Sequence, residues 1–167
     1  MTSEIGSNPS IQRLDSEVSK AYAGPGEIDV GGYRINVEDV LGRGSFGSVC
    51  QAHVIDTGLP IAAKGILIAD RFNQYDQMRS MAMDEGEKMK TCSHQNIVKL
   101  YDYYEHGNKV WLFMEFCDLG DLNNYLAQNE HIGFPEKFQI MNETTMAFSY
   151  LHRHDIVHRD IKPKTYC

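Results

Sequence analysis

The sequence predicts an α+β fold, in which a five-stranded antiparallel sheet with one helix is followed by further helices. Three observations support this prediction. Short apolar stretches alternate with polar residues at a period of two, glycine-containing turns separate these stretches, and longer segments without breakers carry apolar residues at helical spacing. Because the strands come first and most of the helices come later, the two kinds of element should form separate lobes.

The elements follow one another with clear boundaries. Residues 1–32 are expected to form a flexible arm, because they are mostly polar and Gly24-Pro25-Gly26 interrupts regular structure. Residues 72–91 lack breakers except Gly86, which predicts a helix, and one side of it should carry Met78, Met81, Ala82, Glu85 and Met89. Strands are predicted at 33–37, 49–54, 61–68, 98–104 and 109–116, and later helices at 120–128 and 136–153.

Composition limits the classes of function. The chain has 167 residues, of which 42% are hydrophobic and 23% charged, so it has the composition of a globular protein. Its formal net charge of −7 argues against nucleic acid as the main partner, because phosphate backbones bind basic surfaces. No segment approaches the ~18 apolar residues of a membrane span, and residues 1–10 do not resemble a signal peptide. We therefore expect a cytoplasmic protein, with the nucleus as the alternative compartment.

A glycine-rich segment is the first stretch that indicates chemistry. Its pattern is Leu41-Gly42-x-Gly44-x-x-Gly47-x-Val49. Glycines let backbone N–H groups approach phosphate oxygens closely. In dinucleotide-binding folds such a loop precedes a helix, whereas here the following residues have the pattern of a strand. The segment is thus predicted to cover a phosphate group from between two strands, and the alternative is a glycine-rich hairpin without a ligand.

A lysine in an apolar strand is the second candidate. Lys64 follows Ile61-Ala62-Ala63, and an ammonium group inside a β-lobe requires anionic partners. Phosphate oxygens could be one partner and Glu85 of the predicted helix another, since Glu85 shares a side with Ala82 and Met89 while Glu87 is rotated away. The alternative is a solvent-exposed lysine at the edge of a strand.

The third candidate is the run His158-Arg159-Asp160-Ile161-Lys162-Pro163 near the end of the sequence. A carboxylate in a loop can accept a proton from a hydroxyl group or orient that group for attack. A neighbouring lysine can neutralise charge that develops on a transferred phosphoryl group. The alternative is a solvated surface loop.

In this order, the three stretches resemble a eukaryotic protein kinase of the serine/threonine branch. The resemblance covers residues 33–164 and implies the kinase fold, with an N-lobe followed by an incomplete helical C-lobe. It further implies that Asp160 is the catalytic base and that Lys162 faces the γ-phosphate of ATP. Supporting stretches are His94-Gln95-Asn96-Ile97-Val98-Lys99-Leu100, Met114-Glu115-Phe116-Cys117, Gly120-Asp121-Leu122 and Tyr150-Leu151-His152.

The resemblance also implies where ATP binds. Gly42, Gly44 and Gly47 would cover the phosphates, and Lys64 would contact them while paired with Glu85. The adenine would lie under Val49 and Ala62 and bond to the backbone at Glu115 and Cys117, and Asp121 would lie near the ribose. The full expected set for the nucleotide is Leu41, Gly42, Gly44, Gly47, Val49, Ala62, Lys64, Glu85, Met114, Glu115, Cys117 and Asp121.

The sequence departs from the family pattern after Lys164. Thr165 occupies the position of the family's metal-binding Asn, and no Asp-Phe-Gly occurs in the 167 residues. We therefore predict no metal-binding residue, a doubtful role for Mg²⁺ in this polypeptide, and little activity of the polypeptide alone. Two alternatives to an active kinase are a short binding or regulatory module and a pseudokinase.

The resemblance divides the sequence into segments with distinct partners. Residues 33–114 are expected to form the N-lobe, 115–121 a hinge and 122–167 the start of the C-lobe. The expected partners are a protein substrate with a serine or threonine acceptor and a regulatory protein on the N-lobe. Nucleic acid is not an expected partner.

Overall fold

A computed structural model describes residues 24–44, 47–68, 75–129, 131–158 and 160–162. These residues form two compact units. The first unit contains the described residues up to Lys90 together with Leu100–Glu115, and the second contains Thr91–Lys99 and the described residues from Phe116 onward. The predicted N-terminal arm lies mostly outside the described residues, as do Thr165 and Cys167.

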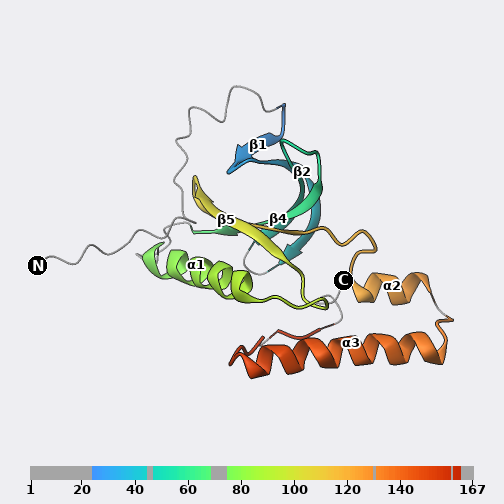
Figure 1. Ribbon diagram of the computed structural model, residues 1–167. Coiled ribbons are helices and arrows are strands. Elements are labelled where there is room, and N and C mark those ends of the chain that lie inside the picture. Colours follow the sequence, from blue (N-terminus) through green and yellow to red (C-terminus); the bar gives the residue numbers. More distant parts are fainter. Residues whose placement is uncertain (1–23, 45–46, 69–74, 130, 159, 163–167) are drawn as a thin grey trace, which may run out of the picture. The chain divides into compact units, whose positions relative to one another are not determined.

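The first unit is built on one antiparallel sheet in the strand order β1-β2-β3-β4-β6-β5, with the helix α1 along one of its faces (Figure 1). Turns at Gly31-Gly32, Gly58 and Gly107 connect neighbouring strands, and all four glycines have positive φ. The elements are β1 (Glu27–Val30), β2 (Tyr33–Gly44), β3 (Gly47–Val54), β4 (Pro60–Leu67), α1 (Tyr75–Thr91), β5 (Leu100–His106) and β6 (Lys109–Glu115).

The sheet has six strands where the sequence predicts five, because β1 precedes the first predicted strand. Residues up to 32 were expected to form an arm, yet Val30 pairs with Tyr33 and Ile28 with Ile35 across a tight hairpin. Gly31 and Gly32 have φ values of 59° and 86°, which two-residue hairpin turns require. Val30 and Ile35 are both buried, so the added strand closes one end of the core.

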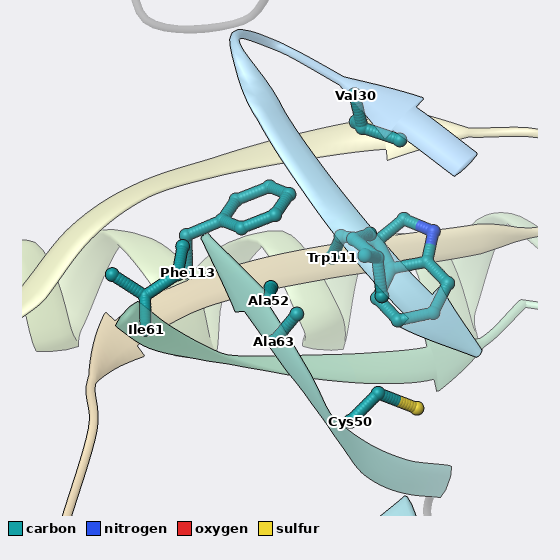
Figure 2. Close-up of a cluster of buried hydrophobic side chains, with 8 residues drawn as sticks. Val30, Cys50, Ala52, Ile61, Ala63, Trp111 and Phe113 are labelled. Carbon is teal, nitrogen blue, oxygen red and sulfur yellow. The ribbon is translucent and has the colours of Figure 1, made fainter. Parts of the chain in front are cut away.

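Each face of the sheet carries one buried cluster. The face away from α1 holds Val30, Ile35, Cys50, Ala52, Ile61, Ala63, Trp111 and Phe113, most of which Figure 2 shows side by side. The face toward α1 holds Ile66, Ile68, Ala82, Leu100, Tyr103, Val110 and Leu112. Because alternate residues of a strand point to opposite faces, the central strands β4 and β6 contribute buried residues to both clusters.

The helix α1 presents a side that differs in part from the predicted one. Met78, Met83 and Met89 pack against the buried cluster, and Ala82 and Gly86 are buried. Met81, which was predicted to face inward, is 59% exposed. Methionines occur on several sides of this helix, so apolar spacing alone could not determine its rotation.

The second unit contains the helices α2 (Leu122–Gln128) and α3 (Phe134–Arg153). Asp121 caps α2 by accepting a hydrogen bond from the Asn124 backbone N–H at 2.8 Å, and Pro135 lies in the first turn of α3. Neither helix contains a buried residue, and Phe134, Phe138 and Met141 on α3 are exposed. Within the part of the chain that the structure describes, no helix combines the length and apolar character that crossing a bilayer demands.

Candidate functional site

The glycine-rich segment joins β2 to β3 as a hairpin, which agrees with its predicted place between two strands. Gly44 pairs with Gly47, and Gly42 pairs with Val49. Gly47 has φ +154°, and a Cβ atom there would lie 1.8 Å from the carbonyl oxygen of Gly65. Gly47 is therefore required by the close approach of β3 to β4. The two residues between Gly44 and Gly47 lie outside the described residues.

Gly42 and Gly44 differ from Gly47 because no packing in the sheet requires glycine there. Among the described residues, no heavy atom lies within 4 Å of the position of a Cβ on Gly42, and a Cβ on Gly44 would meet only the Gly47 carbonyl at 3.9 Å. Neither has a positive φ. As far as the described residues go, the surface beside these two glycines is open, which leaves room for a ligand to approach the backbone. Leu41, next to them, is 46% exposed.

Strand register places most of the predicted nucleotide residues on one face of the sheet. Directly paired residues of an antiparallel sheet point to the same face. Val49 pairs with Lys64, and Ala62 pairs with Met114. Since Gly42 pairs with Val49 and Gly44 with Gly47, the face that carries α1 also carries seven of the twelve: Gly42, Gly44, Gly47, Val49, Ala62, Lys64 and Met114.

Lys64 and Glu85 are brought together by β4 and α1. The Lys64 Nζ lies 2.6 Å from the Glu85 Oε1, and the side chains are 29% and 38% exposed. The alternative of an isolated, solvent-exposed lysine therefore does not describe Lys64. A lysine ammonium carries three N–H donors, so the pairing leaves donors for an anionic ligand.

The predicted hinge residues divide between the two units. Glu115 ends β6 and pairs with Ile61, and Met114 packs on the α1 side of the sheet. Cys117 and Asp121 belong to the second unit. The carboxylate of Asp121 is used as the cap of α2, a structural role that sequence reasoning did not assign to it.

Asp160 and Lys162 form an exposed pair in the second unit. The Lys162 Nζ lies 2.7 Å from the Asp160 Oδ2, and the Asp160 N–H donates to the Nδ1 of His158 at 3.4 Å. The hydrogen bond from Lys162, and then the charges of Lys162 and His158, lower the pKa of Asp160. Asp160 is thus an ionised acceptor at neutral pH. Arg159, Pro163 and Thr165 lie outside the described residues.

Sequence reasoning missed the contacts between α1 and β5. The Tyr103 hydroxyl donates to the Glu87 Oε2 at 2.6 Å, so Glu87 turns toward β5 and does not simply face solvent. Glu105 accepts from the Tyr75 hydroxyl at 2.9 Å and from the Arg79 Nε at 2.7 Å. Tyrosines and acidic residues adjoin one another along β5, but that pattern does not indicate which helix residues they meet.

The donor sets differ in what they could hold. Open backbone at Gly42 and a half-buried ammonium at Lys64 fit a nucleotide phosphate. Carboxylate-rich sets are what Mg²⁺ prefers, and among the described residues no group of three His, Cys, Asp or Glu side chains lies close enough to hold a metal ion. The described residues therefore suit a phosphate group and do not form a metal centre.

Comparison with known proteins relates this arrangement to one family. Residues 35–165 match the family described as "Protein kinase domain". The chain is 35% identical over 126 residues to calcium-dependent protein kinase 5 of Plasmodium berghei, covering 74% of this chain and 21% of that protein. It is 34% identical over 126 residues to serine/threonine-protein kinase PLK4 of Xenopus laevis, covering 75% and 13% respectively.

A solved structure extends the likeness to the fold. The crystal structure of Rad53 1-466 in complex with AMP-PNP has a TM-score of 0.68 and 28% sequence identity to this chain. The match covers 80% of this chain and 33% of that one. The chain thus spans between about an eighth and a third of the length of these relatives.

Proposed function

The chain belongs to the protein kinase domain family, and from this premise we propose that it forms the ATP-binding and catalytic-loop part of a serine/threonine kinase. In the complete protein, the reaction would transfer the γ-phosphate of ATP to serine or threonine hydroxyls of protein substrates. Its relatives are named as serine/threonine kinases, and one solved relative contains AMP-PNP.

The observation that carries the proposal is the ion pair between Lys64 and Glu85. A lysine held at 2.6 Å by a helix glutamate has a fixed orientation. It lies on the same sheet face as the open backbone at Gly42. Lys64 would bind phosphate oxygens of ATP, while Val49, Ala62 and Met114 would provide the apolar surface for the base.

Asp160 and Lys162 would act on the acceptor and on the transferred group. The lowered pKa of Asp160 makes it a weak base in the resting state but a permanent hydrogen-bond acceptor, which suits orienting a hydroxyl group. Lys162 would neutralise charge on the phosphoryl group. ATP supplies the transferable phosphoryl group when bound.

Nucleotide binding by the purified chain tests the proposal. We expect ATP to bind saturably in titration calorimetry, and Lys64→Met to weaken binding about tenfold or more, as the loss of a hydrogen bond to a charged group does. Lys137→Met, which removes an exposed lysine of α3, is the matched control and should bind like the parent chain. Absence of saturable binding, or equal weakening by both substitutions, would contradict the proposal.

Phosphoryl transfer is proposed for the complete protein, because the chain spans only 21% of the first relative above. For the 167-residue polypeptide we propose nucleotide binding with little transfer, since Thr165 occupies the expected Asn position and Asp-Phe-Gly does not occur in it. A phosphorylation assay with a general protein substrate measures this. Rapid transfer by the purified polypeptide would overturn this part, whereas binding without transfer also fits a regulatory module or pseudokinase.

A further inference from the structure

The position of α1 on the sheet depends on a contact that involves neither Lys64 nor Glu85. Gly86 is buried in the middle of α1, where glycine is less favourable than alanine. A Cβ on Gly86 would lie 2.8, 3.0 and 3.1 Å from the Cγ, Cδ1 and Cδ2 of Tyr103. Glycine therefore lets the helix backbone lie directly on this ring, which we call the Gly86–Tyr103 contact.

The contact and the ion pair lie at the two ends of one row across the sheet. Lys64 on β4 pairs with Leu112 on β6, and Leu112 pairs with Tyr103 on β5. The three side chains share the face toward α1, and the row spans two strand spacings, roughly 10 Å. Consecutive helix residues meet its ends: Glu85 bonds to Lys64, and Gly86 lies on Tyr103.

Further interactions hold the Tyr103 end in place. The Tyr103 side chain is 1% exposed, and its hydroxyl donates to the Glu87 Oε2 at 2.6 Å. The Lys90 Nζ, one turn after Gly86, lies 5.7 Å from the centre of the same ring and 2.9 Å from the Asp102 Oδ1. The ring cannot move aside easily, because the nearest atom to a new Cβ is its root.

We propose that Gly86 and Tyr103 are positioning residues, which set the distance between α1 and β5 so that Glu85 reaches Lys64. The expected effect on nucleotide binding rests on the proposed function. The positioning geometry itself does not. An alanine at position 86 needs about 1 Å more room. Moving α1 outward by that amount lengthens the Lys64–Glu85 contact and weakens the orientation of the lysine.

The test measures the ion pair directly, without nucleotide, in the 167-residue chain. Acetic anhydride acetylates Lys64 at a rate that peptide mass spectrometry reports, and Glu85→Gln provides the unpaired reference. We expect Gly86→Ala to raise the rate severalfold toward that reference. Met81→Ala on the exposed side of α1 is the control and should leave it unchanged. An unchanged rate in folded Gly86→Ala would overturn the proposal.

A compensating second substitution distinguishes a positioning role of Gly86 from general destabilisation of the fold. Tyr103→Ala removes the three atoms that a Cβ at position 86 would meet, so the double variant Gly86→Ala/Tyr103→Ala should return the acetylation rate of Lys64 toward that of the parent chain. Failure of this rescue in a folded double variant would contradict the proposal. If Gly86→Ala does not fold, Tyr103→Ala alone decides. Without the ring the helix is less constrained and Lys64 should react faster, whereas an unchanged rate overturns the proposal.

Nucleotide affinity provides the second measurement. Gly86→Ala should weaken ATP binding about tenfold, as the loss of one hydrogen bond involving a charged group does, and the double variant should recover most of it. If the parent chain does not bind ATP, the proposed function fails while the acetylation result still decides the role of the contact. If the parent binds and Gly86→Ala binds equally well, the positioning role fails alone.

Discussion

The two units differ in how their side chains are supported. Among the described residues, both buried clusters come from the first unit, and neither α2 nor α3 contributes a buried residue. Lys64 and Glu85 therefore lie on elements that contribute to a buried core, whereas the side chains of Asp160 and Lys162 are 71% and 53% exposed. The proposed phosphate-binding pair is organised by a core, while the proposed catalytic pair depends on two exposed side chains.

The largest expected difference between the units is in local stability. Amides of β3, β4 and β6 should exchange only through unfolding of the first unit, at about 5 kcal/mol or more. Amides of α3 should open at roughly 1–2 kcal/mol, because few buried contacts support this helix. Hydrogen exchange with mass spectrometry measures both. Uniformly strong protection through residues 135–155 in a monomer would remove the distinction.

A matched pair of phenylalanine substitutions should reproduce the difference in a single measurement. Phe113 is fully buried and stacks on Tyr33 with 4.1 Å between ring centres, whereas Phe138 is 60% exposed. Phe113→Ala should lower the free energy of unfolding by about 3–5 kcal/mol, and Phe138→Ala should change it by about 0.5 kcal/mol or less. Urea unfolding followed by fluorescence of the single tryptophan, Trp111, reports on the first unit. Similar losses for both variants would contradict the comparison.

Alkaline pH should act mainly on the first unit. Burial, followed by the hydrogen bond to Glu87, raises the pKa of Tyr103 from 10.0 to about 12, and burial also raises the pKa of Tyr104. The folded state favours the protonated hydroxyls, so this stabilisation is complete below pH 10 and is lost as pH rises through about 12. Unfolding curves collected across this range measure the loss, and Tyr103→Phe should make it shallower. A pH dependence that the substitution leaves unaltered would assign the effect elsewhere.

The smallest expected effect concerns the exposed pair. Lys162→Met should raise the pKa of Asp160 toward its ordinary value of 3.8, because the hydrogen bond from Lys162 is the main cause of its lowering. The pH titration of the Asp160 carboxyl carbon by NMR reports this shift. Lys137→Met should leave the pKa of Asp160 unchanged. A similar shift in both variants would mean that overall charge, not the contact with Lys162, determines this pKa.

Local patterns predicted most of the fold, because strands and turns have short-range signals. Alternation and glycine turns located β3 to β6 to within a few residues. The strand β1 was missed because Gly24-Pro25-Gly26 was taken as part of an arm, although Gly31-Gly32 is itself a hairpin signal. Fold class was predictable at this level, while the number of strands depended on one ambiguous turn.

The candidate site was predictable only where a residue type is chemically unusual for its surroundings. Lys64 in an apolar strand required a partner, and Glu85 was the inward-facing acid. In the sequence, Gly86 is only a weak interruption of a helix. Glycine is needed there because the helix backbone lies on the ring of Tyr103, which is distant in sequence. Contacts of this kind depend on how far a helix is rotated and how closely it packs, and neither follows from periodicity.

The glycines of the β2–β3 hairpin are constrained for two different reasons, packing within the sheet and the proposed binding of a ligand. Gly47 has no room for a side chain because the backbone of Gly65 lies against it, whereas none of the described residues fills the space beside Gly42. A mutational survey that measured only the amount of folded protein would therefore score Gly47→Ala as damaging and Gly42→Ala as neutral. If a phosphate group binds beside Gly42, that second substitution would matter only when the ligand is present. Tolerance measured without the ligand would then understate how constrained this hairpin is.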